Sequence, residues 1–258
     1  MKDGALALPD GFYLHSFDVI GSTSDEAKAM ARAGAPQGTL VWARLQTSGR
    51  GRRGRAWVSP PGNLYCSLVW RPGGAPAKAA QLSFVTALAM ADALAPLLGP
   101  ATELRYKWPN DLLANGRKLS GILLESETTV NDSVDFVVIG IGVNLASTPA
   151  SGEVEYPPTS IVAEGGAAPA PEVPLAAFAR SFDEWARRWR EHGFAPVRTA
   201  WLARARGLGE PIRVRLERHT LTGRFVDLDE DGALVLGTEQ GNRRITAGEV
   251  FPATCPAL

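Results

Sequence analysis

The spacing of apolar residues changes once along this chain, near residue 208, and that change limits the folds that the chain can adopt. Upstream, aromatic residues recur at helical spacing and predict a buried helix face: Phe178, Phe182, Trp185 and Trp189. Downstream, short runs of alternating apolar and polar residues are separated by turns such as Asp231-Gly232, which predicts a small β-barrel. We therefore expect two domains, residues 1–208 and 209–258.

The first of these domains mixes helix and strand signals. Thr23 and Glu26 have the spacing of a capping box, and Gly34 is placed to end the helix that follows. Asn115-Gly116 lies between two apolar runs and predicts a tight hairpin. Further apolar runs predict strands over residues 38–45, 64–70, 104–108 and 135–145 and a long helix over residues 77–98. The segment 148–174, rich in proline, glycine and alanine, is expected to be irregular.

Charge is balanced over the 258 residues but uneven along them. No acidic residue lies between Glu26 and Asp92, a stretch that carries nine basic residues. They are Lys28, Arg32, Arg44, Arg50, Arg52, Arg53, Arg55, Arg71 and Lys78. This bias predicts an anionic ligand, and phosphate is the first candidate, carried by either a nucleotide or a nucleic acid.

Residues 47–57, TSGRGRRGRAW, form what we name the arginine loop; four arginines and three glycines fall within residues 49–55. Glycine lets the backbone fold over a ligand, and arginine supplies forked, permanently charged donors for phosphate or carboxylate. A solvated surface loop and a nucleic-acid-binding segment are the alternatives. The loop lacks the interleaved aromatic residues of a base-stacking surface.

Three further motifs carry polar residues at the ends of apolar runs: KWPNDLL, GRKLSGILLE and GIGVN. Lys107, Asn110 and Asp111 supply an ammonium, an amide and a carboxylate, which suit phosphate, a nucleoside and a magnesium ion. Lys118 opens an apolar strand, and Asn144 follows two glycines that leave room for a flat ligand. Each motif taken alone also fits an ordinary turn or sheet edge.

Taken together, the motifs are far more specific. Ser22-Thr23, Gln46 with GRGRRGR, KWPND, KLSGILLE and GIGVN, in this order and spacing, resemble the biotin–protein ligases. The resemblance runs from Phe17 to Phe251 and includes the run RRITAGEV near the C-terminus. Ser24 departs from the asparagine of many members, and Ser120 from their alanine or glycine.

This resemblance implies an α+β fold: a class II synthetase-like mixed sheet flanked by helices, followed by a small SH3-like β-barrel. It implies that biotin and ATP, with Mg²⁺, give biotinyl-5′-AMP, and that a lysine of a biotin carboxyl carrier protein domain then takes the biotinyl group. Fixed cations offset the negative charge that gathers where a carboxylate meets a phosphate. A glycine–arginine loop that closes over the adenylate would exclude water.

The resemblance also implies roles for individual residues. Catalytic cations are expected at Lys118, Arg50 and Lys107. Biotin is expected to contact Ser22, Thr23, Gln46, Gly49, Arg50, Lys118 and Gly121. ATP or the adenylate is expected at Arg52, Arg53, Arg55, Trp57, Lys107, Asn110, Asp111 and Asn144, with Asp111 also positioning the metal ion.

Other classes are less consistent with the chain. Some members carry an N-terminal DNA-binding domain, but here the pattern begins at Ser22, so we expect no repressor role and no DNA partner.

The N-terminus lacks a secretory signal, and the two cysteines, Cys66 and Cys255, have no metal-binding spacing, so we expect a cytoplasmic protein without a membrane partner. A lipoate or octanoate ligase is the alternative enzyme, and the sequence does not decide between monomer and homodimer.

Overall fold

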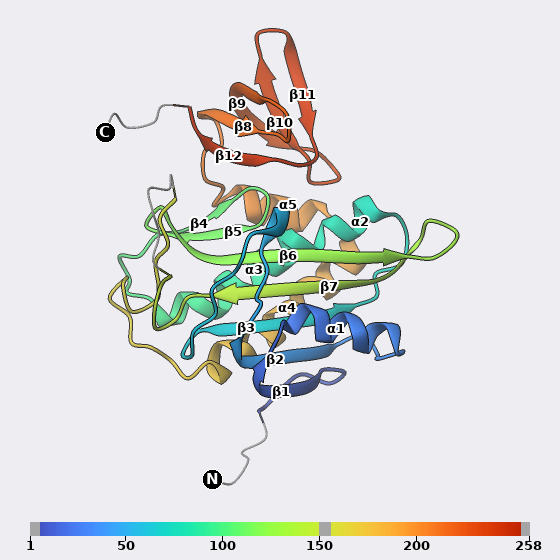
Figure 1. Cartoon of the computed structure of the whole chain (residues 1–258). Helices are drawn as coiled ribbons and strands as arrows, with labels where there is room; N and C mark the ends of the chain where they lie inside the picture. Colours follow the sequence, from blue (N-terminus) through green and yellow to red (C-terminus); the bar gives the residue numbers. More distant parts are fainter. Residues whose placement is uncertain (1–5, 150–155, 254–258) are drawn as a thin grey trace.

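Two sheets organise the protein, whose computed structural model describes residues 6–149 and 156–253; Cys255 lies outside them (Figure 1). The first sheet has seven strands in the order β1-β2-β3-β7-β6-β5-β4, and the second has five in the order β11-β10-β9-β8-β12. β1 runs parallel to β2, whereas the other pairings in the first sheet are antiparallel. The expected mixed sheet followed by a small β-domain is confirmed, while the division at residues 208 and 209 stays a prediction.

The strands of the first sheet are β1 (Tyr13–Ile20), β2 (Thr39–Gln46), β3 (Leu64–Trp70), β4 (Leu104–Lys107), β5 (Asp111–Ala114), β6 (Arg117–Thr128) and β7 (Val134–Val143). The helices are α1 (Thr23–Arg32), α2 (Pro76–Ala80), α3 (Leu82–Leu94), α4 (Glu172–His192) and α5 (Ala195–Leu202), with short 3₁₀ turns η1 (Arg52–Gly54) and η2 (Ala95–Leu97). The second sheet contains β8 (Pro211–Arg215), β9 (Thr220–Leu228), β10 (Leu234–Thr238), β11 (Gly241–Ile245) and β12 (Glu249–Pro252).

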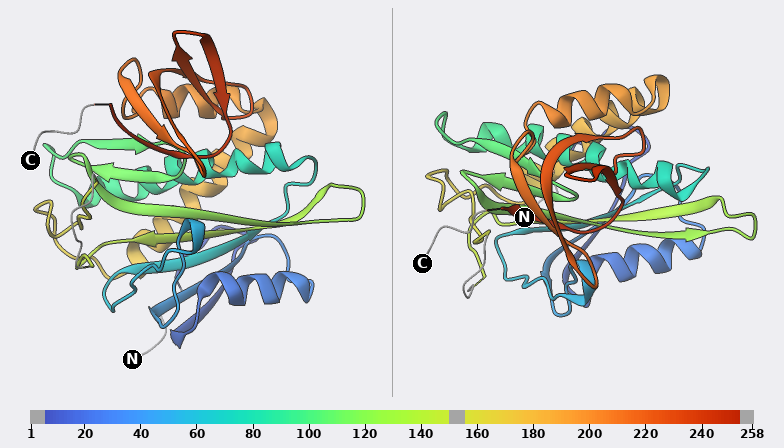
Figure 2. Two further views of the ribbon diagram at one scale, coloured as in Figure 1. Left: turned by 45° about the horizontal axis from the view of Figure 1, so that its top comes forward. Right: turned by 90° about the horizontal axis from the view of Figure 1, so that it is seen from above.

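Helices cover both faces of the first sheet (Figure 2). α1 lies on one face, where Ala27 and Ala31 pack against Val41, Val69 and Phe136. α3 and α4 lie on the other face. There the aromatic stripe of α4 faces the core as expected, with Phe178, Phe182 and Trp189 buried and Trp185 partly buried. The sheet is therefore a layer buried on both sides, which fits the continuous apolar runs of β3 and β7.

The N-terminus of α1 differs from the expected capping box by one residue. Ser22, not Thr23, is the N-cap, and its hydroxyl accepts a hydrogen bond from the backbone N–H of Asp25 at 3.4 Å. Thr23 is the first helical residue and is buried, which leaves its hydroxyl to face the sheet. Gly34 follows the helix with a φ of +89°, as expected of a helix C-terminus.

The expected long apolar helix is divided at Gln81 into α2 and α3. The stretch Pro76–Leu97 is long and apolar enough to cross a membrane by length and composition, but 72% of its apolar window is buried inside the protein. α3 packs on α4 and α5, which makes it a core helix of this fold.

The C-terminal domain rests on the first domain near the α2–α3 junction. Gly232 lies so close to Phe84 that a Cβ there would come within 2.6 Å of the ring. The Gly232 carbonyl accepts a hydrogen bond from the Trp108 indole at 3.1 Å, and the Gln81 amide donates to the Glu230 carbonyl at 3.0 Å. These contacts hold the second sheet beside the strand ends that carry KWPND.

Candidate active site

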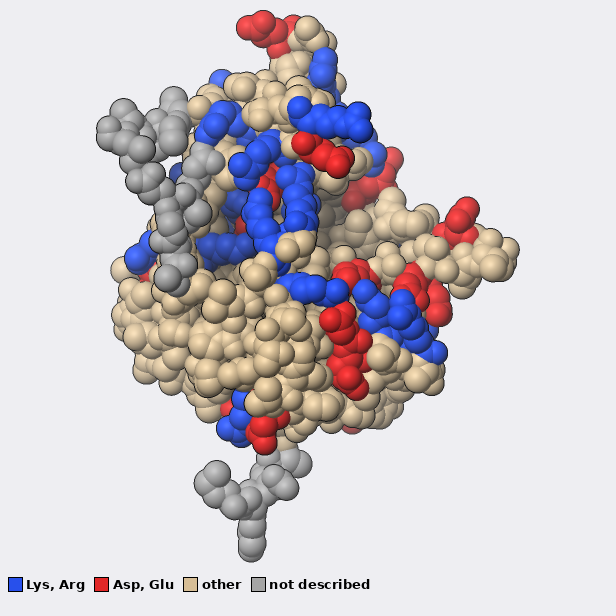
Figure 3. All heavy atoms as spheres, viewed as in Figure 1, with Lys and Arg blue, Asp and Glu red and all other residues tan. Residues whose placement is uncertain are grey.

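A cavity of about 680 Å³ lies between the first sheet, the arginine loop and the C-terminal domain. Lysine and arginine side chains gather around the hollow between the two domains (Figure 3). The cavity is lined by thirteen of the fifteen residues expected at the site: Ser22, Thr23, Gln46, Arg50, Arg52, Arg55, Trp57, Lys107, Asn110, Asp111, Lys118, Gly121 and Asn144. Gly49 and Arg53 do not line it. The topology thus brings four separate motifs to one place.

One end of the cavity is made of neutral hydroxyl and amide groups. Thr23 donates to the Gln46 side-chain oxygen from both its backbone N–H, at 2.8 Å, and its hydroxyl, at 3.0 Å. The Gln46 amide nitrogen donates in turn to Ser59 at 3.0 Å. Behind them, the buried Ser67 hydroxyl lies 2.8 Å from that of Thr23 and 3.0 Å from that of Ser24. The Gln46 side chain is therefore fixed in orientation by partners on both of its polar atoms.

Two glycines and an indole form the middle of the cavity. Gly121 of β6 is the cross-strand partner of Gly142 of β7. The Trp57 ring lies against both: a Cβ on Gly142 would sit 2.3 Å from it and a Cβ on Gly121 3.0 Å. The indole nitrogen of Trp57 is buried without a hydrogen-bond partner among the residues described, as is the side-chain oxygen of Asn144. Buried polar atoms normally have partners, so these two are hydrogen-bonding groups that the described protein leaves unsatisfied.

The other end of the cavity holds two lysines around one carboxylate. Lys107 Nζ lies 3.0 Å from one Asp111 oxygen, and Lys118 Nζ lies 2.7 Å from the other. Burial by itself raises the pKa of the Asp111 carboxyl, but the Lys118 and Lys107 ammonium groups together lower it to about 2. The hairpin at Asn115-Gly116, confirmed by positive φ at both residues, turns β5 into β6 and so places Lys118 beside Asp111.

The backbone of Lys118 is held by the segment after residue 155. Its N–H donates to the Pro157 carbonyl, and its carbonyl accepts from the Thr159 N–H, both at 2.8 Å. The Asn144 amide donates to the Thr159 carbonyl at 3.0 Å, so the GIGVN strand end binds the same segment. This explains how an otherwise irregular stretch contributes to the site.

The arginine loop is folded back on itself. Arg50 and Ala56 form an isolated β-bridge, and the Gly51 N–H donates to the Arg55 carbonyl at 2.7 Å. Gly49 permits this return, because a Cβ there would lie 2.5 Å from the Trp57 carbonyl oxygen. Gly49 therefore shapes the loop by allowing this close backbone contact, although it does not line the cavity.

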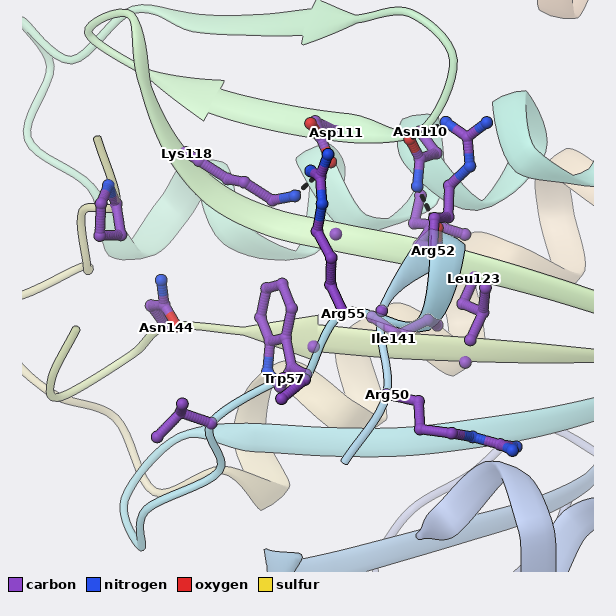
Figure 4. A pocket seen from close by; sticks show the side chains of 18 of the residues that line it. Arg50, Arg52, Arg55, Trp57, Asn110, Asp111, Lys118, Leu123, Ile141 and Asn144 are labelled. Carbon is purple, nitrogen blue, oxygen red and sulfur yellow. Dashed lines mark hydrogen bonds and ion pairs between the residues drawn. The ribbon is translucent and has the colours of Figure 1, made fainter. Parts of the chain in front are cut away.

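Three arginines of the loop, Arg50, Arg52 and Arg55, point in different directions (Figure 4). Arg52 donates to the Asn110 side-chain oxygen at 3.1 Å, and burial lowers the pKa of its guanidinium. Arg50 instead points away from Lys118, toward the carboxylates of Asp25 at 2.5 Å and Glu125 at 3.2 Å. Arg53 is exposed and has a φ of +55°. Arg52 and Arg55 are thus the members of the loop whose charges face the lysine end of the cavity.

Residues that the sequence reasoning missed also line the cavity: Ser24, Leu123, Tyr156, Arg215, Glu249 and Phe251. The Lys107 ammonium lies 4.9 Å from the Tyr156 ring centroid and 5.7 Å from that of Phe251, within cation–π range. Phe251 comes from β12, so the C-terminal domain contributes to the cavity directly. Tyr156 gave no signal in the sequence because it lies in an irregular segment.

Comparison with known proteins agrees with this geometry. The family model "Biotin/lipoate A/B protein ligase family" matches residues 16–144, and "Biotin protein ligase C terminal domain" matches residues 207–251. The chain is 49% identical over 233 residues to a biotin–[acetyl-CoA-carboxylase] ligase of Paracoccus denitrificans, covering 89% of this chain and 96% of the relative. The chain belongs to the biotin protein ligases.

Solved structures of biotin protein ligases share the fold. The enzyme from Aquifex aeolicus in complex with biotin and ATP is 28% identical, with a TM-score of 0.77 over 92% of this chain and 97% of that one. A Leishmania major biotin protein ligase in complex with biotinyl-5-AMP is 27% identical, with a TM-score of 0.59 over 91% and 98% of the two chains. The match therefore extends over both domains of the ligase.

Proposed function

We propose that this chain is an ATP-dependent ligase that activates biotin as biotinyl-5′-AMP and transfers the biotinyl group to a lysine of a biotin carboxyl carrier protein domain. The observation that carries the proposal is that one cavity is lined both by neutral hydroxyl and amide groups and by lysine and arginine side chains. Such a cavity suits a substrate with a neutral polar head and a carboxylate that must meet a phosphate. The relatives named for this activity and the complexes with biotin, ATP and biotinyl-5-AMP support it.

In the first half-reaction, a biotin carboxylate oxygen forms a bond to the α-phosphorus of ATP. The bond from that phosphorus to the bridging oxygen of the β-phosphate breaks, and pyrophosphate leaves with the electron pair. Negative charge from a carboxylate and a triphosphate gathers at one point. Lys118, Lys107 and Arg52 are the cations proposed to offset it, and because they are fixed before the reaction, little reorganisation is required.

At the neutral end, we propose that Ser22, Thr23 and Gln46 bind the ureido group of biotin. Gln46 is held by Thr23 and Ser59, so its amide is oriented before a ligand arrives. The Trp57 indole nitrogen and the Asn144 oxygen, which are buried without a partner among the described residues, are proposed to pair with ligand atoms further along the cavity. A role for Arg50 at the carboxylate requires its guanidinium to leave Asp25 and Glu125.

Magnesium is proposed as a companion of the ATP phosphates, whose charge it would neutralise when bound. The described residues include no group of three or more His, Cys, Asp or Glu side chains that could hold a metal ion. Both Asp111 oxygens already face ammonium groups. The side chains present do not fit a metal site made by protein alone, and a metal-binding role for Asp111 stays a prediction that requires displacement of a lysine.

In the second half-reaction, the neutral amine of the acceptor lysine attacks the acyl carbon of the mixed anhydride. The bond from that carbon to the AMP oxygen breaks, AMP leaves, and the nitrogen loses a proton. We propose that the arginine loop, folded over the cavity, keeps water away from the anhydride until the acceptor arrives. The glycine-assisted turn at Gly49 supports this closed form.

The test is to incubate the protein with biotin, MgATP and a carrier domain and to measure the mass of the carrier. We expect one added biotinyl group, and none when ATP is omitted. A carrier in which the acceptor lysine is replaced by arginine provides the matched control.

Pyrophosphate exchange without any acceptor isolates the first half-reaction. Biotin should drive exchange, whereas lipoate and octanoate should not. Exchange driven by lipoate or octanoate and not by biotin would overturn the proposed substrate while leaving the ligase chemistry intact.

A further inference from the structure

Glu249 connects the C-terminal domain to the arginine loop. It begins β12, is only 8% exposed, and its carboxylate binds two guanidinium groups. One belongs to Arg215, at the end of β8 in the same sheet. The other belongs to Arg55, whose Nη2 lies 2.7 Å away and which is part of the arginine loop of the first domain. A single carboxylate therefore joins the loop to the second sheet.

The residue before Glu249 adds a second contact between the same two parts. The Gly248 carbonyl accepts a hydrogen bond from Arg52 Nη1 at 3.4 Å, and this guanidinium also donates to Asn110. Within the loop, the Gly51 N–H to Arg55 carbonyl bond and the Arg50–Ala56 bridge tie the strands of the turn together. Holding Arg55 in place therefore holds the turn that carries Arg52.

The excess of positive charge around the cavity explains why a carboxylate is needed to hold the arginine loop in place. Six basic residues line the cavity: Arg50, Arg52, Arg55, Lys107, Lys118 and Arg215. Among the described lining residues, only Asp111 and Glu249 are acidic, and each of them faces two cations. Burial alone raises the pKa of Glu249, but Arg215 and Arg55 lower it to about 2, so its charge persists at neutral pH. Without this charge, the like charges of the loop and the lysines would favour an open loop.

We propose that Glu249 is a positioning residue through which the C-terminal domain holds the arginine loop closed over the cavity. The anchor itself follows from the contacts of Arg52 and Arg55. Its consequence, retention of the acyl-adenylate, rests on the proposed function. The carboxylate acts through the loop and needs no contact with substrate.

Limited trypsin digestion of the ligand-free protein tests the anchor, because the loop contains four cleavage sites between residues 50 and 55. Glu249→Gln keeps the shape of the side chain and removes its charge. We expect cleavage within residues 50–55, followed by mass spectrometry, to be several-fold faster in this variant than in the wild type. Equal rates of loop cleavage would overturn the proposal.

The matched control is Asp231→Asn, which removes a carboxylate paired with Arg244 at 2.6 Å elsewhere in the C-terminal domain. Its loop should be cleaved at the wild-type rate. If Glu249→Gln unfolds the second sheet, Arg55→Gln tests the same pair from the first domain. Faster cleavage at residues 50, 52 and 53 supports the anchor, and unchanged cleavage refutes it.

A second experiment measures how well the enzyme retains the acyl-adenylate. With biotin and MgATP but no carrier domain, leaked intermediate labels lysines of a bystander protein such as serum albumin. Glu249→Gln should increase this labelling several-fold, and Glu249→Asp should restore part of the retention. Unchanged labelling would overturn the retention step. Absence of adenylate even in the wild type would instead refute the proposed function and leave the digestion result standing.

Discussion

Gly121 and Gly142 pair directly across β6 and β7, and the Trp57 indole occupies the space that side chains at these positions would fill. The two glycines come from different motifs, and the indole comes from the arginine loop. The glycine pair is thus the surface on which the loop rests when it covers the sheet. Close approach, rather than backbone freedom, explains these glycines, because neither has a positive φ.

Gly142→Ala should therefore damage the site without unfolding the sheet. The new Cβ would sit 2.3–2.6 Å from Trp57, so the indole and its loop must move. We expect kcat/KM for biotin in pyrophosphate exchange to fall on the order of 10²-fold, as displacements of about 1 Å do at reacting centres. Gly99→Ala is the control, because its Cβ would meet nothing closer than 3.9 Å. A Gly142→Ala enzyme with wild-type kinetics would show that Trp57 does not contribute.

The hydroxyl of Thr23 is expected to matter for biotin and not for ATP. Thr23→Val keeps the shape of the side chain but removes the bonds of its hydroxyl to Gln46 and Ser67, so that the Gln46 oxygen keeps only the bond from the Thr23 backbone N–H. We expect the KM for biotin to rise about tenfold, the worth of roughly one buried hydrogen-bonded group, with the KM for ATP unchanged.

Thr86→Val is the matched control for that change. Thr86 is also fully buried, but its hydroxyl donates to the Leu82 carbonyl inside α3. Both variants should lose some thermal stability, whereas only Thr23→Val should alter biotin binding in isothermal titration. An equal rise in the KM for ATP would contradict a role confined to the biotin end.

The sequence predicted the parts of this site that depend on residues close together in the chain, and missed those that depend on residues far apart in it. Lys107, Asp111 and Lys118 were identified because short motifs place them at strand ends, and two local turns, at Pro109-Asn110 and Asn115-Gly116, bring these strand ends together. The capping box was wrong by one residue, because sequence spacing cannot show that the hydroxyl of Thr23 bonds to Gln46 across 23 residues. β1 was missed because it is a largely exposed edge strand without the clean alternation of a half-buried one.

Contacts between domains lay beyond sequence reasoning. Glu249 and Phe251 reach the cavity only because the C-terminal domain docks on Phe84 and Trp108, which no local pattern encodes.

Arg50 was expected at the substrate, but its partners Asp25 and Glu125 lie 25 and 75 residues away in the chain. Its catalytic role stays a prediction.

Removal of the Lys118 ammonium should stop adenylate formation. Lys118→Met keeps most of the aliphatic stem and removes the ammonium, which lies 5.5 Å from the Trp57 ring centroid and beside Asp111. We expect biotin-dependent pyrophosphate exchange to fall about 10²- to 10³-fold, as when one charge-stabilising donor is lost at a reacting centre. Lys78→Met is the control. Lys78 is an exposed lysine on α2 whose ammonium lies over the Trp189 ring of α4, and this variant should exchange normally. Exchange within a few-fold of wild type would exclude Lys118 from the reaction.

Asp111 should give the protein a component of stability that is lost only in strong acid. Its pKa is about 2 in the folded protein and about 3.9 in an unfolded chain. The folded state therefore favours the ionised form, and this contribution, about 2–3 kcal/mol, is complete above the unfolded pKa and disappears as pH falls through about 2. Urea unfolding of wild type and Asp111→Asn at pH 6, 4 and 2.5 measures it. The difference in unfolding free energy between the two proteins should be largest at pH 6, only slightly smaller at pH 4 and clearly smaller at pH 2.5. A difference that is constant over the three pH values would show that the two lysines do not hold the carboxylate in its charged form.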